Sequence, residues 1–409
     1  MISKRVTRLV AKSSPIAAAH FRVEAEPYHP KWRPNGYLNL GTAENRLVWD
    51  LLAPRLAKRR PLTAADTHYT PLHGMPTFRE AIAHFLSRVC RTPINAEDLV
   101  VVSGATAALD IIASALCDPG EAIAVPAPYY GAFDIDLTGH SEARLIPVPL
   151  SSSRLFHLTP ETIDRVLTQT RRDGIAVRAV ALTSPSNPVG CVYPAQTLQE
   201  IIQVAAQHDV DIITDEIYAN SVFGPVPFIS LLDEEINSTR PEHTHMVWGF
   251  AKDFALSGFK VGVLYTPDQD IRAAARVLAY FAPTSTDTQV LLRDILADTD
   301  WVDYFLAESQ RRLALSYARS TQLLDEFSIP YIPATAGFFV WTDLRAWLPT
   351  PTFAAERALW GRIFEIMRVN ILPGEVFACP EPGWFRICHT TDPALVREGI
   401  TRLGRLLHS

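Results

Sequence analysis

Short apolar runs alternate with helical patterns between about residues 75 and 290, and this alternation constrains the fold more than any other feature of the chain. The runs are LVVVS (99–103), AIAVP (122–126), AVALTS (179–184), VDIITDE (210–216), HMVWGF (245–250) and KVGVLY (260–265). Strands that alternate with helices form a largely parallel sheet covered by helices on both faces. The last two runs are close enough in sequence to pair antiparallel. We therefore predict an α/β fold.

The pattern changes near residue 300, where a long amphipathic helix is predicted over residues 301–327. Two short strand candidates, GFFVWTD (337–343) and WFRICHT (384–390), follow it and predict a second, smaller α+β domain. A chain of this length can bury more than one core. The predicted units are an N-terminal arm with part of the small domain (1–66), a large cofactor-binding domain (67–295) and the small domain (296–409).

Charge and cysteine content exclude several classes of protein. The formal net charge is −6 and no dense Lys/Arg cluster recurs, so we expect no nucleic-acid partner. No stretch approaches the ~18 uninterrupted apolar residues of a membrane span, so we expect no membrane association. The five cysteines are odd in number and lack CxxC spacing, which predicts reduced thiols in a cytoplasmic protein. The basic N-terminal segment, with no acid before Glu24, predicts an arm on a partner subunit; a transit peptide is the alternative.

Polar side chains come at the ends of four predicted strands. Tyr129 follows AIAVP, Asn187 follows AVALTS, Asp215 ends VDIITD and Lys252 follows HMVWGF. Ligands of open α/β sheets bind beyond the carboxyl ends of the strands, so we expect these side chains to meet at one edge. The antiparallel return brings Lys260, at the start of the next run, back to the same edge.

Two of the six lysines fall within GFAKDFALSGFK (249–260), in a chain that otherwise relies on arginine for positive charge. Only an amine can lose its proton and condense with a carbonyl cofactor. Taken alone, Asp215 could cap a helix, Asn187 could form an Asx turn, Tyr129 could be a core aromatic, and Thr106 in SGATAALD could cap a helix. Together they predict a pyridoxal phosphate site, which needs an amine, a carboxylate for the ring nitrogen, an aromatic face and a phosphate cup. No metal is expected.

The chain resembles fold-type I pyridoxal phosphate enzymes and, within them, the 1-aminocyclopropane-1-carboxylate (ACC) synthase group of the class I/II aminotransferase family. The similar segments cover roughly residues 27–390 and occur in the family's order. They are LGTAENRLVWDLL, YTPLHGMPTFREAI, SGATAALDIIASALCDPGEAIAVPAPYYGAFDIDL, SPSNPVGCVY, DEIYANSVF, AKDFALSGFKVGVLY, TAGFFVWTDL and EPGWFRICHTTD. The resemblance implies an aspartate aminotransferase-like fold with a seven-stranded, mostly parallel sheet.

The resemblance also implies roles for the residues that hold the cofactor. Lys252 would bind it covalently and then act as the Cα base, Asp215 would pair with the ring nitrogen, and Tyr129 would stack on the ring. Asn187 and Tyr218 would bond the ring oxygen.

Further roles concern the phosphate, the substrate and the partner subunit. Ala105, Thr106 and Lys260 would bind the phosphate. Tyr69 would reach the phosphate in the neighbouring subunit, which implies a homodimer with composite active sites. On the substrate side, Arg386 would grip the α-carboxylate next to Asn187, and Glu44 would lie near the substrate side chain.

Two positions depart from the family's pattern. Gly249 stands where a phosphate-binding serine is usual, and Lys260 stands where an arginine is usual. A lysine supplies a point charge but not the two-pronged guanidinium, so we expect a phosphate cup with fewer donors.

The sequence is compatible with two kinds of reaction at the substrate. The presence of Glu44 and the AKDFALSGF likeness favour loss of a Cγ leaving group, with S-adenosylmethionine or a related amino acid as substrate. Ring closure, γ-elimination and γ-replacement are the possible outcomes, in specialised biosynthesis. An aminotransferase that passes the amino group to a 2-oxo acid is the alternative.

Overall fold

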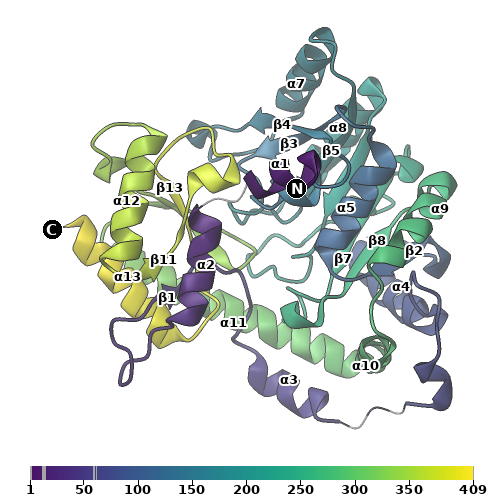
Figure 1. Cartoon of the computed structure of the whole chain (residues 1–409), viewed down its shortest axis with the longest axis horizontal. Coiled ribbons are helices and arrows are strands. Elements are labelled where there is room, and N and C mark those ends of the chain that lie inside the picture. Colours follow the sequence, from purple (N-terminus) through teal and green to yellow (C-terminus); the bar gives the residue numbers. More distant parts are fainter. Residues whose placement is uncertain (1, 12–14, 59, 61, 409) are drawn as a thin grey trace.

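A seven-stranded sheet forms the centre of the larger part of the computed structural model, which describes residues 2–11, 15–58, 60 and 62–408 (Figure 1). The strand order is β2-β8-β7-β6-β5-β3-β4, and β8 alone runs antiparallel to its two neighbours in this sheet. Its strands are β2 (Leu99–Val102), β3 (Ala122–Ala127), β4 (Arg144–Pro149), β5 (Val177–Thr183), β6 (Asp211–Asp215), β7 (Thr244–Gly249) and β8 (Gly262–Tyr265). The predicted α/β class and the antiparallel pairing of the last two runs are confirmed.

Alternate residues of these strands face opposite helical layers, as the two-residue period of a strand requires. Val100 and Val102 of β2 pack with α5 and α9, whereas Leu99 and Val101 pack with α4 and α10. Both faces of the sheet are therefore buried, which explains the continuous apolar runs in the sequence. The helices are α1 (Lys4–Ala11), α2 (Pro15–Ala25), α3 (Trp49–Leu56), α4 (Pro76–Cys90), α5 (Ala105–Leu116), α6 (Phe133–Asp136), α7 (Pro160–Arg172), α8 (Ala195–His208), α9 (Gln269–Leu278), α10 (Thr286–Ala297), α11 (Thr299–Glu326), α12 (Phe353–Glu365) and α13 (Pro393–Leu407).

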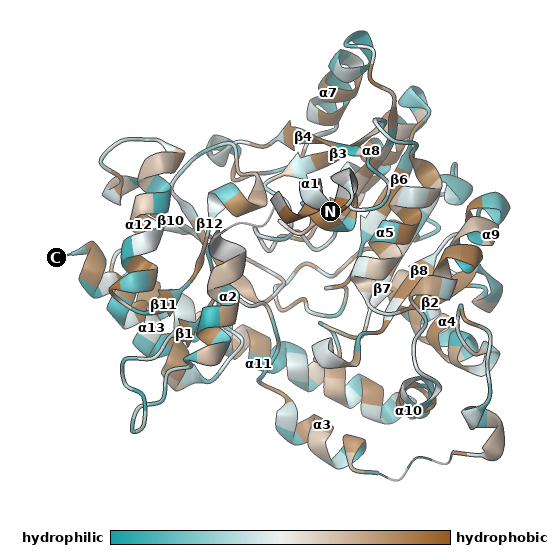
Figure 2. Ribbon diagram, in the orientation of Figure 1, coloured by the Kyte–Doolittle hydropathy of each residue, from teal (hydrophilic) through white to brown (hydrophobic). Residues whose placement is uncertain are grey.

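A second, antiparallel sheet forms in the C-terminal part, with the order β12-β13-β10-β9. Its strands are β9 (Tyr331–Ile332), β10 (Phe339–Asp343), β12 (Leu372–Pro373) and β13 (Trp384–Cys388). The predicted long helix is confirmed as α11, and outer helices such as α7 and α13 carry both hydrophilic and hydrophobic residues (Figure 2). The domain boundaries at 66/67 and 295/296 stay a prediction.

The N-terminal segment joins this C-terminal part. Strand β1 (Leu38–Asn39) pairs in parallel with β11 (Val369–Asn370), and Leu38 and Leu40 belong to the apolar core that contains Ile400 of α13. This pairing fixes the loop that begins at Gly41, next to the carboxyl ends of the large sheet. Among the described residues, no helix combines the length and the apolar content needed to cross a bilayer.

Candidate active site

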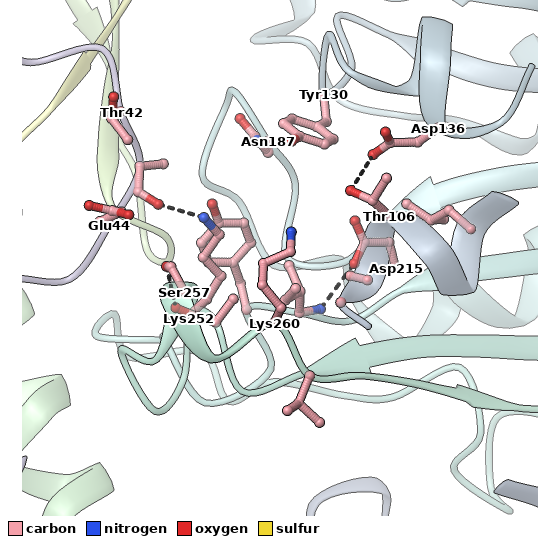
Figure 3. A pocket seen from close by; sticks show the side chains of 18 of the residues that line it. Thr42, Glu44, Thr106, Tyr130, Asp136, Asn187, Asp215, Lys252, Ser257 and Lys260 are labelled. Carbon is pink, nitrogen blue, oxygen red and sulfur yellow. Dashed lines mark hydrogen bonds between the residues drawn. The ribbon is translucent and has the colours of Figure 1, made fainter. Parts of the chain in front are cut away.

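A cavity of about 330 Å³ opens beyond the carboxyl ends of β6 and β7, beside the start of α5 (Figure 3). Nine of the eleven residues predicted for the site line it, and Tyr129 and Tyr69 do not. The nine are Glu44, Ala105, Thr106, Asn187, Asp215, Tyr218, Lys252, Lys260 and Arg386. The strand ends therefore bring together side chains that lie far apart in the sequence, as the sheet-edge argument predicts.

Lys252 lies in the turn after β7 and points into this cavity (Figure 3). Its Nζ donates a hydrogen bond to the carbonyl oxygen of Ala43 at 2.5 Å. Burial and, to a smaller extent, the nearby Arg386 lower the pKa of Lys252 to about 8, against the opposing carboxylates of Glu44 and Asp215. A lowered pKa makes the neutral, nucleophilic amine more accessible near neutral pH.

Asp215 ends β6 and is buried, with one carboxylate oxygen accepting the Ile217 N–H at 3.2 Å. Burial raises the pKa of Asp215 to about 7; Asp136 adds to the rise and Lys252 opposes it. A buried carboxyl of this kind is stabilised as an anion when a cationic donor is placed against it. The protonated ring nitrogen of pyridoxal phosphate is such a donor, so Asp215 fits the cofactor.

Arg386 reaches the cavity from the middle of β13 and connects three segments. Its Nη1 donates to Asn187 Oδ1 at 2.9 Å, and its Nη2 donates to the Gly41 carbonyl oxygen at 2.7 Å. The guanidinium also lies 5.1 Å from the Phe339 ring centroid and 4.8 Å from that of Phe377. Its buried Nε has no hydrogen-bond partner among the described residues. A guanidinium that lines a cavity is suited to a substrate carboxylate.

Tyr218 lies one turn beyond Asp215 and is buried. Its ring packs edge-on against Phe338 and Phe339, with ring centroids 5.2 Å and 5.7 Å apart. These contacts hold the phenol in one orientation at the cavity wall, beside Asn187 and Arg386. Tyr218 and Asn187 thus line the same cavity, as predicted.

The start of α5 forms a site suited to an anion. Gly104 precedes the helix with φ of +94°, a conformation open to glycine, and Gly104, Ala105 and Thr106 line the cavity. The first N–H groups of a helix have no partner within it and can bind an anion. A Cβ built on Gly104 would lie 3.3 Å from both Cε and Nζ of Lys260, so the lysine side chain lies against this helix start. Ala105, Thr106 and Lys260 thus offer backbone donors and one positive charge to a phosphate.

The structure corrects the predicted position of the aromatic face. Tyr129 does not line the cavity; its Oη donates to Asp134 Oδ1 at 2.9 Å and its N–H bonds the Phe377 carbonyl oxygen. Tyr130 lines the cavity instead and is drawn beside Asn187 (Figure 3). The two tyrosines are adjacent beyond the end of β3, where strand alternation no longer tells which one faces the site.

The interpretation of Gly249 also changes. This residue does not line the cavity; it pairs with Gly262 across β7 and β8. A Cβ on Gly249 would lie 2.6 Å from the Val261 carbonyl oxygen, closer than side chains are normally found. The glycine therefore permits the two strands to approach, and a serine here would have to displace the backbone before its hydroxyl could serve a phosphate.

Sequence reasoning missed Asp136, the last residue of α6. It lines the cavity, is buried, and accepts a hydrogen bond from Thr106 Oγ1 at 3.2 Å. Its place in FDID, shortly after a strand end, was the available signal. Tyr69 is the second predicted site residue that does not line the cavity. It follows a short 3₁₀ helix (Ala64–Thr67) and is fully exposed in this chain.

Comparison with known proteins agrees with this geometry. The family model described as aminotransferase class I and II matches residues 35–403. The 1-aminocyclopropane-1-carboxylate synthase CMW33 of Cucurbita maxima is 37% identical over 392 residues, which cover 91% of this chain and 80% of that protein. A 1-aminocyclopropane-1-carboxylate synthase of Nicotiana tabacum is 36% identical over 410 residues, covering 95% of this chain and 83% of that protein.

Among solved structures, an aspartate aminotransferase from Thermus thermophilus with maleate superimposes with a TM-score of 0.83. The superposition covers 99% of each chain, at 24% sequence identity. This likeness confirms the predicted aspartate aminotransferase-like fold.

Proposed function

Since this chain belongs to the class I and II aminotransferase family, we propose that it acts on an α-amino acid with a leaving group at Cγ, of the S-adenosylmethionine type. The chain is a pyridoxal phosphate-dependent enzyme. One observation carries the proposal: the amine of Lys252, the guanidinium of Arg386 and the carboxylate of Glu44 face one cavity, in a chain 37% identical to an ACC synthase.

Each of three side chains in the cavity has a separate role in the proposed reaction. Pyridoxal phosphate held in this cavity would supply an electron sink that makes the proton on the substrate Cα acidic. Lys252 accepts that proton, which its lowered pKa allows near neutral pH. Arg386 would hold the substrate carboxylate, and Asp215, as an anion, would hold the protonated ring nitrogen of the cofactor.

Glu44 supports a cationic substrate. It lines the cavity beside Lys252, and its carboxylate bonds the Arg46 guanidinium at 3.1 Å on the outer side. A sulfonium at the substrate Cγ brings a positive charge that a carboxylate attracts, and a sulfide leaves readily from it. Loss of that group gives ring closure, γ-elimination or γ-replacement; an aminotransferase reaction is the alternative.

Purified protein mixed with S-adenosylmethionine will release methylthioadenosine, measured by chromatography. A second mixture contains common amino acids with 2-oxoglutarate, and glutamate formation there reports transamination. We expect the first product to form much faster than the second, because Glu44 favours the sulfonium. Glutamate formation without methylthioadenosine would overturn the proposed Cγ chemistry and establish the alternative.

We further propose a homodimer whose subunits complete one another's cavities. Tyr69 is fully exposed here and outside its own cavity, so it is available to a second copy. Val277, Tyr280 and Phe281 are also exposed, at 70%, 66% and 81%, and form an apolar surface. The Ser103 N–H bonds the Ala282 carbonyl oxygen at 2.8 Å, which places this surface beside the phosphate cup.

Mixing Tyr69→Phe subunits with Lys252→Ala subunits will restore activity above both parents. Each heterodimer then contains one cavity free of both substitutions, if Tyr69 serves the opposite subunit. The matched control mixes Tyr69→Phe subunits with the Tyr69→Phe/Lys252→Ala double variant, which leaves no intact cavity and should give no gain. Equal activities in the two mixtures, with subunit exchange confirmed by mass spectrometry, would contradict the shared site.

The cellular location is also part of the proposal. The five cysteines are unpaired in the described structure, and four of them are buried. Burial raises the pKa of Cys191 to about 11 and that of Cys117 to about 12, so these thiols are unreactive. Free thiols are typical of a reducing compartment, which supports a cytoplasmic enzyme.

A further inference from the structure

An acidic side chain lies where the cofactor phosphate is expected. Asp136 is 6% exposed, lines the cavity and faces the hydroxyl of Thr106 at the start of α5 (Figure 3). The same helix start offers its N–H groups to an anion. A carboxylate beside a phosphate dianion is repulsive, so the proposed phosphate cup does not by itself explain why this acid is present.

The charges around Asp136 come from several elements. From the segment before β8, Lys260 favours the ionised carboxylate, and from α5, Asp110 disfavours it. Asp110 is itself held by His140 at 2.8 Å. Asp215, at the end of β6, is another acid of the cavity, and its pKa is raised by Asp136.

Burial is the largest influence on the pKa of Asp136 and raises it to about 6. The hydrogen bond from Thr106 opposes this rise. Tyr130, another titratable group of this cavity, has its own pKa raised by burial and by Asp136, while Arg386 opposes the rise. A dianion placed beside Asp136 would raise the pKa of this carboxyl further. The single positive charge of Lys260 faces both the carboxyl and the incoming phosphate.

We propose that Asp136 is the acid of the phosphate site, which must be protonated for the cofactor phosphate to bind tightly. When the phosphate arrives, the carboxylate takes one proton from solvent and its new O–H donates to a phosphate oxygen. Once the carboxyl is neutral, the positive charge of Lys260 interacts with the phosphate and no longer with a competing carboxylate. This inference rests on the proposed placement of the cofactor and makes Asp136 a residue that touches it.

The test compares the wild-type full chain with Asp136→Asn, which keeps the shape of the side chain but cannot ionise. Cofactor is removed, and the dissociation constant of pyridoxal phosphate is measured by absorbance titration from about pH 5.5 to about pH 8. We expect the ratio of wild-type to variant dissociation constants to rise at least about tenfold over this range, because each pH unit above the pKa lowers the protonated fraction about tenfold. Pyridoxal, which lacks the phosphate, should give a ratio that does not change with pH.

Asp134→Asn is the matched control, because Asp134 lies two residues earlier on α6 and bonds Tyr129 outside the cavity. Its dissociation constants should follow those of the wild type at every pH. If Asp136→Asn does not fold, isothermal calorimetry of the wild type in buffers of different ionisation enthalpy gives proton uptake directly. Uptake should be larger with inorganic phosphate or pyridoxal phosphate than with pyridoxal.

A ratio independent of pH, the same rise with pyridoxal, or equal proton uptake with all three probes would overturn the inference. Failure of the proposed cofactor site looks different. In that case the wild type binds no pyridoxal phosphate at any pH and shows no visible absorbance band.

Discussion

After incubation with pyridoxal phosphate and removal of the unbound cofactor, Lys252→Ala and Lys252→Arg proteins will lack the absorbance band of a lysine-bound cofactor, and they will turn over substrate at least about 10⁴-fold more slowly than the wild type. The amine of Lys252 is the group that can join the cofactor covalently and then move the Cα proton. Arginine retains positive charge but cannot condense with an aldehyde, so it should fail as completely as alanine. The measurements are the visible absorbance spectrum and the rate of methylthioadenosine release.

Lys260→Arg is the matched control, because it alters the other lysine of the same cavity and keeps its charge. This variant should retain the visible band and measurable turnover. A Lys252→Ala protein with the wild-type band, or a wild type that shows no bound-cofactor band once the unbound cofactor is removed, would contradict the assignment of Lys252. Thermal unfolding of all three variants separates a chemical defect from a folding defect.

Arg386→Lys and Arg386→Leu proteins will keep the visible band but lose about 10²- to 10⁴-fold in kcat/KM. Each hydrogen bond to a charged group contributes about 1.5–3 kcal/mol, and the carboxylate would lose two of them. The leucine variant also removes the donors to Asn187 and to the Gly41 carbonyl oxygen. Steady-state kinetics and spectral titration with substrate measure the loss.

Arg357→Lys provides the control for this pair of variants. Arg357 is an exposed residue of α12 that pairs with Glu375, outside the cavity. Its replacement should leave kcat/KM unchanged. An Arg386→Lys protein whose KM and spectral titration match the wild type would show that the substrate carboxylate is held elsewhere.

Most strands of the central sheet and most residues of the site could be predicted from the sequence, because both depend on local sequence patterns. Six strands of the central sheet are apolar runs that are largely buried, and three polar residues that come at the ends of such runs, Asn187, Asp215 and Lys252, line the cavity. The edge strand β4 was missed. It contains Pro147 and Pro149 and is largely exposed, so it lacks the apolar signal of a buried strand.

The errors at the site have a different origin. Choosing between Tyr129 and Tyr130 required the path of the chain beyond β3, where the two-residue period ends. Asp136 lies on a helix of four residues, too short to show a helical period. The role of Gly249 depends on the carbonyl of Val261 across the strand pair, a contact that no local pattern encodes.

The bonds made by Arg386 also bear on how the enzyme is produced. The residues that it joins, Gly41 and Arg386, are 345 positions apart in the chain. A ribosome must therefore release nearly the whole polypeptide before this wall of the cavity can form. Contacts of such separation form late in folding, because the long intervening loop must first be ordered. If Arg386 binds the substrate carboxylate as proposed, this part of the cavity is completed only after nearly all of the chain has been synthesised.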